Sequence, residues 1–196
     1  MVNQVLQGDC LEVMKDIPDK SIDMILCDLP YGTTACKWDT IIPFEPLWEQ
    51  YKRIIKDNGA IVLTASQPFT SALVMSNPKM FKYEWIWEKS LPVGYLDANR
   101  KPLKCHENIC VFFSKKPTYN PQFWFSKPYK HQGRSKDADQ YREVKKTKID
   151  NKDGRRFPLS FIKFQNNERG LHPTQKPVAL FEYLIKTYTN EGDMVL

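Results

Sequence analysis

The sequence predicts an α/β fold with a mainly parallel sheet. Apolar, strand-like runs at residues 21–28 and 60–66 alternate with segments of helical periodicity, which is the pattern of such folds. Both runs carry few polar residues, as expected for strands that helices cover on two faces. A chain of 196 residues with 41% hydrophobic residues is long enough for one sizeable core.

The first half of the chain supplies most of the predicted elements. The clearest helix covers residues 43–59, because Leu47, Trp48, Tyr51, Ile54 and Ile55 fall on one stripe. Asn58 and Gly59 provide its stop signal. Shorter elements are expected on both sides of it, with strands at 5–7, 83–90 and 107–115 and helices at 10–17 and 67–77.

The second half is less regular. Periodicity is lost between residues 115 and 171, where prolines, lysines and aromatic residues mix, so this region is predicted to be an insertion. A helix follows from Pro177, with an apolar face of Val178, Phe181, Leu184, Ile185 and Tyr188, and residues 192–196 begin another strand. We therefore expect a core at 1–114, an insertion at 115–171 and the start of a second half at 172–196.

The composition excludes several classes of protein. No apolar stretch reaches the roughly 18–20 residues of a membrane span, and no signal peptide is visible, so a cytoplasmic protein is expected. Cys105, His106 and Cys110 form a tempting metal cluster, but a structural zinc site would need a second ligand pair at regular spacing. Reduced thiols and no bound metal are the better interpretation.

The positive charge is concentrated in one segment. Residues 127–156 hold 11 Lys or Arg and 5 Asp or Glu, a net charge of +6 that equals the charge of the whole chain. Such an excess favours contact with a polyanion, most commonly nucleic acid. A solvated, flexible basic loop is the alternative.

The motif Asp28-Leu29-Pro30-Tyr31-Gly32 follows the strand predicted at 21–28, where α/β folds bind their ligands. The Asp28 carboxylate and the Leu29 carbonyl could accept hydrogen bonds from both N–H groups of a planar amine, while the Tyr31 ring stacks on its face. Pro30 would stiffen the loop and Gly32 would let the backbone turn. Methylation of an exocyclic base amine needs such a clamp, because the amine is a poor nucleophile while its lone pair is delocalised. An ordinary turn is the alternative for these residues alone.

A second motif, "HPTQKP" at residues 172–177, favours the base-amine clamp over an ordinary turn. Together with "GDCLEVM" and "CDLPYG", it closely resembles the amino-directed DNA methyltransferases, which methylate adenine N6 or cytosine N4. The order of the motifs is similar to the permuted β group, including adenine methylases of phages and mobile elements. The resemblance covers residues 3–114 and 171–196 and implies a Rossmann-like class I methyltransferase fold.

The resemblance also implies roles for single residues. Asp28, Leu29, Pro30 and Tyr31 match the catalytic tetrad that grips a flipped base in double-stranded DNA. The family more often has a proline at the position of Leu29, but that role belongs to the backbone. The leading acid favours adenine N6, and cytosine N4 is the alternative target. The residues that match the S-adenosylmethionine-binding segments are Asp9, His172, Thr174, Gln175 and Lys176.

The insertion at 115–171 lies where the family carries target recognition. Its basic residues are expected to contact phosphates, and Gln132 or Asn151 could read base edges. The expected phosphate contacts are Lys127, Lys130, Arg134, Lys145, Lys146, Arg155 and Arg156. Cytosine C5 methylation is excluded, because that chemistry typically uses a Pro-Cys dipeptide and none occurs here.

Three aromatic residues outside the tetrad have two open interpretations. Trp38 precedes Asp39 after the tetrad, and core packing with an N-cap role for Asp39 is weighed there against substrate contact. Trp85 and Trp87 share one face of a predicted strand, so both belong either to the core or to a pocket wall.

One expected part is missing from the pattern. The family places an aromatic-x-Gly-x-Gly loop after the "GDMVL" strand, but the eight glycines here are never closer than 16 residues apart. The expectation is therefore a C-terminally truncated enzyme, a gene fragment, or a chain that a second polypeptide or a homodimer completes. The isolated chain is then expected to bind S-adenosylmethionine weakly and to turn over slowly, and a non-catalytic DNA-binding remnant is the alternative function.

Overall fold

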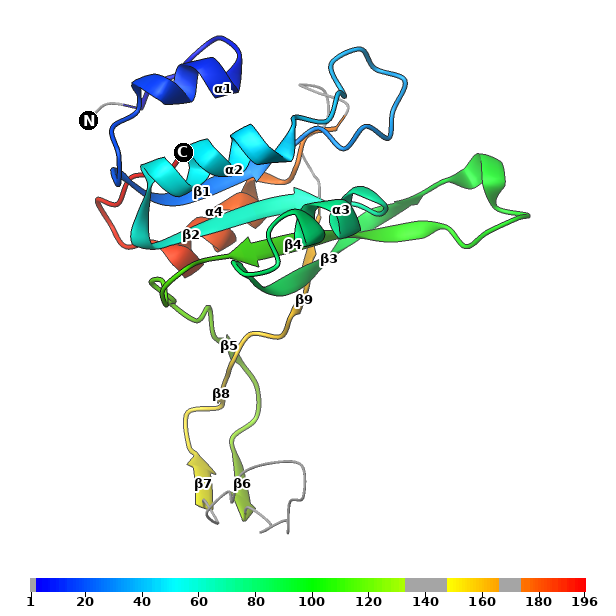
Figure 1. The fold of residues 1–196 in the computed structure, drawn as a ribbon. Helices are drawn as coiled ribbons and strands as arrows, with labels where there is room; N and C mark the ends of the chain where they lie inside the picture. The colour runs from blue at the N-terminus through cyan, green and yellow to red at the C-terminus, as the bar shows by residue number, and fades with distance from the viewer. Residues whose placement is uncertain (1–2, 133–147, 166–173) are drawn as a thin grey trace. The chain divides into compact units, whose positions relative to one another are not determined.

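The computed structural model describes residues 3–132, 148–165 and 174–196. The chain divides into two compact units, one formed by 1–120 with 160–196 and the other by 121–159. The second unit is narrower than the predicted insertion at 115–171. Figure 1 shows the elements of both units.

The larger unit is built around a five-stranded sheet in the order β1-β2-β4-β3-β9. The pairs β1–β2 and β3–β9 are parallel, whereas β4 is antiparallel to both of its neighbours. Near the C-terminus, Val195 forms a parallel bridge to Met24 on the free side of β1, in the segment predicted as a strand. The strands are β1 (Ile22–Asp28), β2 (Ile55–Ala65), β3 (Phe81–Val93), β4 (Lys104–Phe112) and β9 (Phe161–Phe164).

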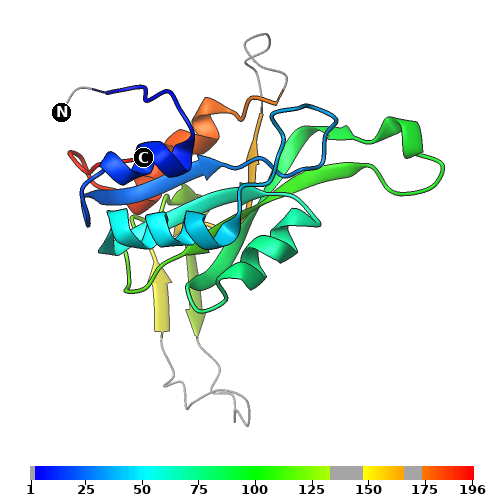
Figure 2. The ribbon, with the colours of Figure 1, turned by 45° about the horizontal axis from the view of Figure 1, so that its top comes forward.

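Helices cover both faces of this sheet, which confirms the predicted α/β class (Figure 2). Alternation along β2 explains the two cores, because Ile61 and Leu63 face one side while Ala60 and Val62 face the other. The first side packs against α1 (Cys10–Val13) with the 3-10 turn η1 (Met14–Asp16), α2 (Phe44–Ile54) and α3 (Phe69–Ser76). The second packs against α4 (Val178–Tyr188).

Two predictions for the first half are wrong, namely where one helix ends and that residues 5–7 form a strand. The helix at 43–59 ends at Ile54, because Ile55 is extended, buried and paired with Ile22, so Asn58 and Gly59 belong to β2. Residues 5–7 form no strand: Val5 is 98% exposed and no neighbouring strand of the described chain pairs with it. Apolar residues alone do not make a strand when the backbone lacks a partner.

The helix predicted from Pro177 is confirmed as α4, but one end of its apolar face differs. Val178 is exposed, while Leu180 is fully buried beside Leu184. The two open interpretations of Trp85 and Trp87 are also decided: Trp85 is buried in the core, whereas Trp87 is both buried and part of a pocket wall. In the part of the chain that the structure describes, no helix is long and apolar enough to cross a membrane.

The smaller unit contains two short antiparallel ribbons. One pairs β5 (Trp124–Phe125) with β8 (Arg155–Arg156), and the other pairs β6 (Tyr129–Gln132) with β7 (Lys148–Asn151). The Arg155 guanidinium lies 4.9 Å from the ring centre of Phe123, and that of Arg156 lies 4.3 Å from Tyr129. Cation–π contacts therefore contribute to this unit.

A buried hydrogen-bond cluster ties α4 to the sheet. The Tyr188 hydroxyl accepts a hydrogen bond from the Trp85 indole at 2.7 Å and lies 2.8 Å from the Tyr83 hydroxyl.

We predict that Tyr188→Phe destabilises the protein by about 1–3 kcal/mol, because the buried Trp85 N–H loses its acceptor. Chemical unfolding measures this. The control is Tyr183→Phe on the same helix, which should change stability by less than about 0.5 kcal/mol; equal effects would contradict the assignment.

Candidate active site

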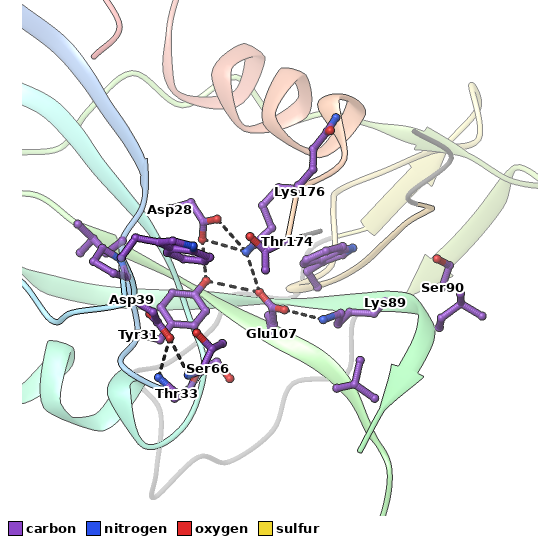
Figure 3. Close-up of a pocket in the computed structure, with 18 residues that line it drawn as sticks. Asp28, Tyr31, Thr33, Asp39, Ser66, Lys89, Ser90, Glu107, Thr174 and Lys176 are labelled. Carbon is purple, nitrogen blue, oxygen red and sulfur yellow. Dashed lines mark hydrogen bonds and ion pairs between the residues drawn. The ribbon is translucent and has the colours of Figure 1, made fainter. Parts of the chain in front are cut away.

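A pocket of about 620 Å³ opens where β1 ends. It brings together the four residues of the predicted tetrad with Thr174, Gln175 and Lys176, which are distant in the sequence (Figure 3). The remaining wall comes from the loop after β1, the end of β2, and strands β3 and β4. The two motifs found in the sequence therefore line one pocket.

Asp28 is the last residue of β1 and is held from two sides. The Thr64 hydroxyl, from the neighbouring position on β2, donates a hydrogen bond to Oδ1, and the Tyr31 hydroxyl donates to the same oxygen at 2.9 Å. The carboxylate keeps about a third of its surface exposed. It is thus oriented but still accessible from the pocket.

Tyr31 lies between two carboxylates. Its hydroxyl lies 2.9 Å from Asp28 and 3.4 Å from Glu107, and burial together with these two negative charges raises the pKa of Tyr31. The phenol is therefore neutral and acts as a donor. Phe69 stacks against the ring, with the centroids 5.4 Å apart.

Glu107 and Lys89 complete the site and were not predicted from the sequence. Glu107, on β4, is 8% exposed and pairs with Lys89 of β3 at 2.7 Å. Lys176, from the segment before α4, lies 2.9 Å from the Asp28 carboxylate and 3.4 Å from Glu107. Two carboxylates thus face two ammonium groups, which is how buried charges are kept inside a protein.

The loop after the tetrad is organised by Asp39. Its carboxylate accepts hydrogen bonds from the backbone N–H groups of Gly32, Thr33 and Thr34 at 2.7–2.9 Å. Gly32 has a φ of +66°, so the predicted backbone turn is present and glycine suits it. Asp39 therefore holds this loop in place through hydrogen bonds, and the N-cap interpretation is wrong. Trp38 is about half exposed and lines the pocket.

The predicted cofactor-binding residues have different positions. Thr174, Gln175 and Lys176 line the pocket. The Asp9 carboxylate instead accepts a hydrogen bond from the Leu11 N–H at 2.8 Å and caps α1, and it is not part of the pocket wall. His172 lies outside the described residues. Among the described residues, no group of three metal-ligating side chains is present.

The predicted DNA-binding residues that the structure describes belong to the smaller unit. Lys127, Lys130 and Arg155 are exposed, whereas Arg156 is half-buried and donates to the Lys127 carbonyl. The Asn151 side chain donates to the Arg155 carbonyl and accepts from Arg156, so it is engaged within the unit. Arg134, Lys145 and Lys146 lie outside the described residues.

Residues 22–196 match the DNA methylase family, and the chain belongs to that family. It is 28% identical to the type II methyltransferase M.HpaI of Haemophilus parainfluenzae, over all of this chain and 63% of that protein. It is 25% identical to M.BglII of Bacillus subtilis over 59% of that protein, and 26% identical to the DNA adenine methyltransferase YhdJ of Escherichia coli over 69%. The chain thus spans about three-fifths of the length of the first two.

Solved structures agree on the fold. The complex of M1.HpyAVI with SAM matches with a TM-score of 0.60 at 21% identity, covering 98% of this chain and 80% of that one. The cytosine-N4-specific PvuII DNA methyltransferase matches with a TM-score of 0.62 at 12% identity, covering 96% and 71%. The predicted class I methyltransferase fold is confirmed.

The stability that Asp39 contributes is expected to depend on pH. Burial opposes its charge, but hydrogen bonds from the Thr34 side chain and the backbone N–H groups of the loop lower its pKa from 3.8 to about 2. Because the pKa is lower in the folded state, this stabilisation is complete above about pH 4 and is lost as the pH falls towards about 2. We predict that Asp39→Asn destabilises the protein by about 1–2 kcal/mol at neutral pH.

Denaturant unfolding of both proteins, down to the lowest pH at which the unmodified chain stays folded, measures the difference. It should shrink as the pH falls below about 4. Glu49→Gln, at an exposed carboxylate on α2, is the matched control. A difference between Asp39→Asn and the unmodified chain that is constant with pH would contradict a role for the Asp39 charge.

Proposed function

We propose that this chain contributes the catalytic site of an S-adenosylmethionine-dependent DNA methyltransferase that acts on adenine N6. The observation that carries the proposal is the Asp28 carboxylate, fixed by Thr64 and Tyr31 at the mouth of a pocket large enough for a base. Family membership and the names of the relatives support the same reaction class.

The exocyclic amine of adenine is a poor nucleophile, so the site must make its lone pair more available. The Asp28 carboxylate and the Leu29 carbonyl accept hydrogen bonds from the two amine N–H groups, so that the nitrogen becomes more tetrahedral and its lone pair turns towards the methyl donor. The Tyr31 ring, backed by Phe69, offers a flat surface for the base. The base must leave the duplex to reach this pocket.

The residues before α4 fit one end of S-adenosylmethionine, which supplies an electrophilic methyl group when bound. Lys176 already pairs with a carboxylate in this structure, and Thr174 and Gln175 line the pocket beside it. This donor set suits the carboxylate of the methionine portion. Asp9 and His172 remain predictions for the same cofactor.

Lys176 also occupies the Asp28 carboxylate that the base amine is proposed to bind. Its ammonium lies 2.9 Å from both Asp28 oxygens and 5.3 Å from the ring centre of Tyr31. A base amine that binds Asp28 therefore competes with Lys176 for the carboxylate. Glu107, 3.4 Å from the same ammonium, offers an alternative anionic partner when Asp28 is used by substrate.

Methyl transfer from tritium-labelled S-adenosylmethionine to DNA tests the proposal. Asp28→Ala should lower the transfer rate by at least about 100-fold, the scale expected when one preorganised group is removed. The exposed Glu49→Gln is the control and should transfer at the unmodified rate. Mass spectrometry of the digested DNA should show N6-methyladenine rather than N4-methylcytosine.

Two results would contradict the proposal. One is transfer that survives Asp28→Ala unchanged. The other is salt-sensitive DNA binding without transfer at any cofactor concentration, which would support the DNA-binding remnant instead.

A further inference from the structure

The hairpin between β3 and β4 projects from the sheet (Figures 1 and 2), and it carries several exposed apolar side chains. Tyr95 is 62% exposed and Leu96 is fully exposed at the 3-10 turn η2 (Tyr95–Asp97), which follows Gly94 with its φ of +95°. Leu91 and Val93 are also exposed on the strand that leads there. Single exposed apolar residues are ordinary, but a group of them on one projection indicates a contact surface.

The same projection carries a positive rim. Arg100 and Lys101 follow the turn and are 85% and 63% exposed. Asp97 lies 3.1 Å from Lys101 and 3.9 Å from Arg100, so one acid faces two cations and the three residues keep a net positive charge. An apolar tip with cations beside it suits a partner that presents both phosphates and an apolar gap.

The hairpin is continuous with the pocket. The register of β3 against β4 shifts between the pairs Glu88–His106 and Val93–Lys104. Within this shift, Lys89, Ser90 and Leu91 face the pocket, and Val93 lines it as well. Leu96 follows Val93 by three residues and thus lies within about 10 Å of it along the chain.

We propose that Leu96 enters the duplex beside the extruded nucleotide and fills the space that the base has left, while Tyr95 stacks on a neighbouring base. Arg100 and Lys101 contact the flanking phosphates. The inference rests on the proposed function, because it takes a DNA duplex with one base in the pocket as the partner. A base in the pocket stays bonded to its strand, so the duplex must lie at the pocket mouth, where the hairpin begins.

Binding to two short duplexes tests the proposal without cofactor or knowledge of the recognition sequence. One duplex is intact, and the other has the same sequence with a single abasic site. Because the abasic duplex already contains the gap, the unmodified chain should bind it more tightly, and Leu96→Ser should reduce that preference by about tenfold. Leu96 is fully exposed, so the substitution leaves folding unaffected.

Two controls separate the contributions. Met75→Ser, at a 72% exposed residue on α3, should keep the preference for the abasic duplex. Arg100→Ala and Lys101→Ala should each weaken binding to both duplexes alike and reduce the slope of log affinity against log salt by about 1.

An unchanged preference in Leu96→Ser, or no preference in the unmodified chain, would overturn the proposal. So would a self-association that Leu96→Ser abolishes, because the surface would then contact a second copy of the chain. The failure of the proposed function looks different: Asp28→Ala would leave methyl transfer unchanged while the preference for the abasic duplex still depended on Leu96.

Discussion

Four charged groups from distant parts of the chain hold the pocket together. Lys176 pairs with Asp28 and Glu107, and Lys89 pairs with Glu107. Glu107 and the Lys176 side chain are at most 10% exposed, so neither charge could stay there without a partner. This network fixes the Asp28 carboxylate and joins the segment before α4 to the end of β1.

The groups that stabilise the pocket are also those that the proposed reaction uses. Asp28 must exchange an ammonium for a base amine, and the neutral Tyr31 hydroxyl keeps the carboxylate oriented during the exchange. Lys89 belongs to β3, which ends at Val93, and the turn η2 with Leu96 follows directly after Gly94. The pocket and the proposed duplex contact are thus adjacent along the chain.

The sequence was sufficient for the parts of the site that local signals describe. A buried run that ends in Asp28 and a proline-framed helix start at Pro177 have recognisable patterns, and both were predicted correctly. Glu107 and Lys89 were missed because their position depends on the sheet order, which brings β4 beside β2. The early end of α2 depends likewise on the pairing of Ile55 with Ile22, a contact between distant residues that helical periodicity does not reveal.

The network predicts that Asp28 and Lys176 are energetically coupled across the pocket. A double-mutant cycle on unfolding free energy tests it most directly, with Asp28→Asn, Lys176→Met and the double variant. The structure predicts a coupling energy of about 1–3 kcal/mol, because the two charges lie 2.9 Å apart within one network in which the Lys176 side chain is only 9% exposed. Additive effects, within about 0.3 kcal/mol, would contradict the claim that this ion pair assembles the site.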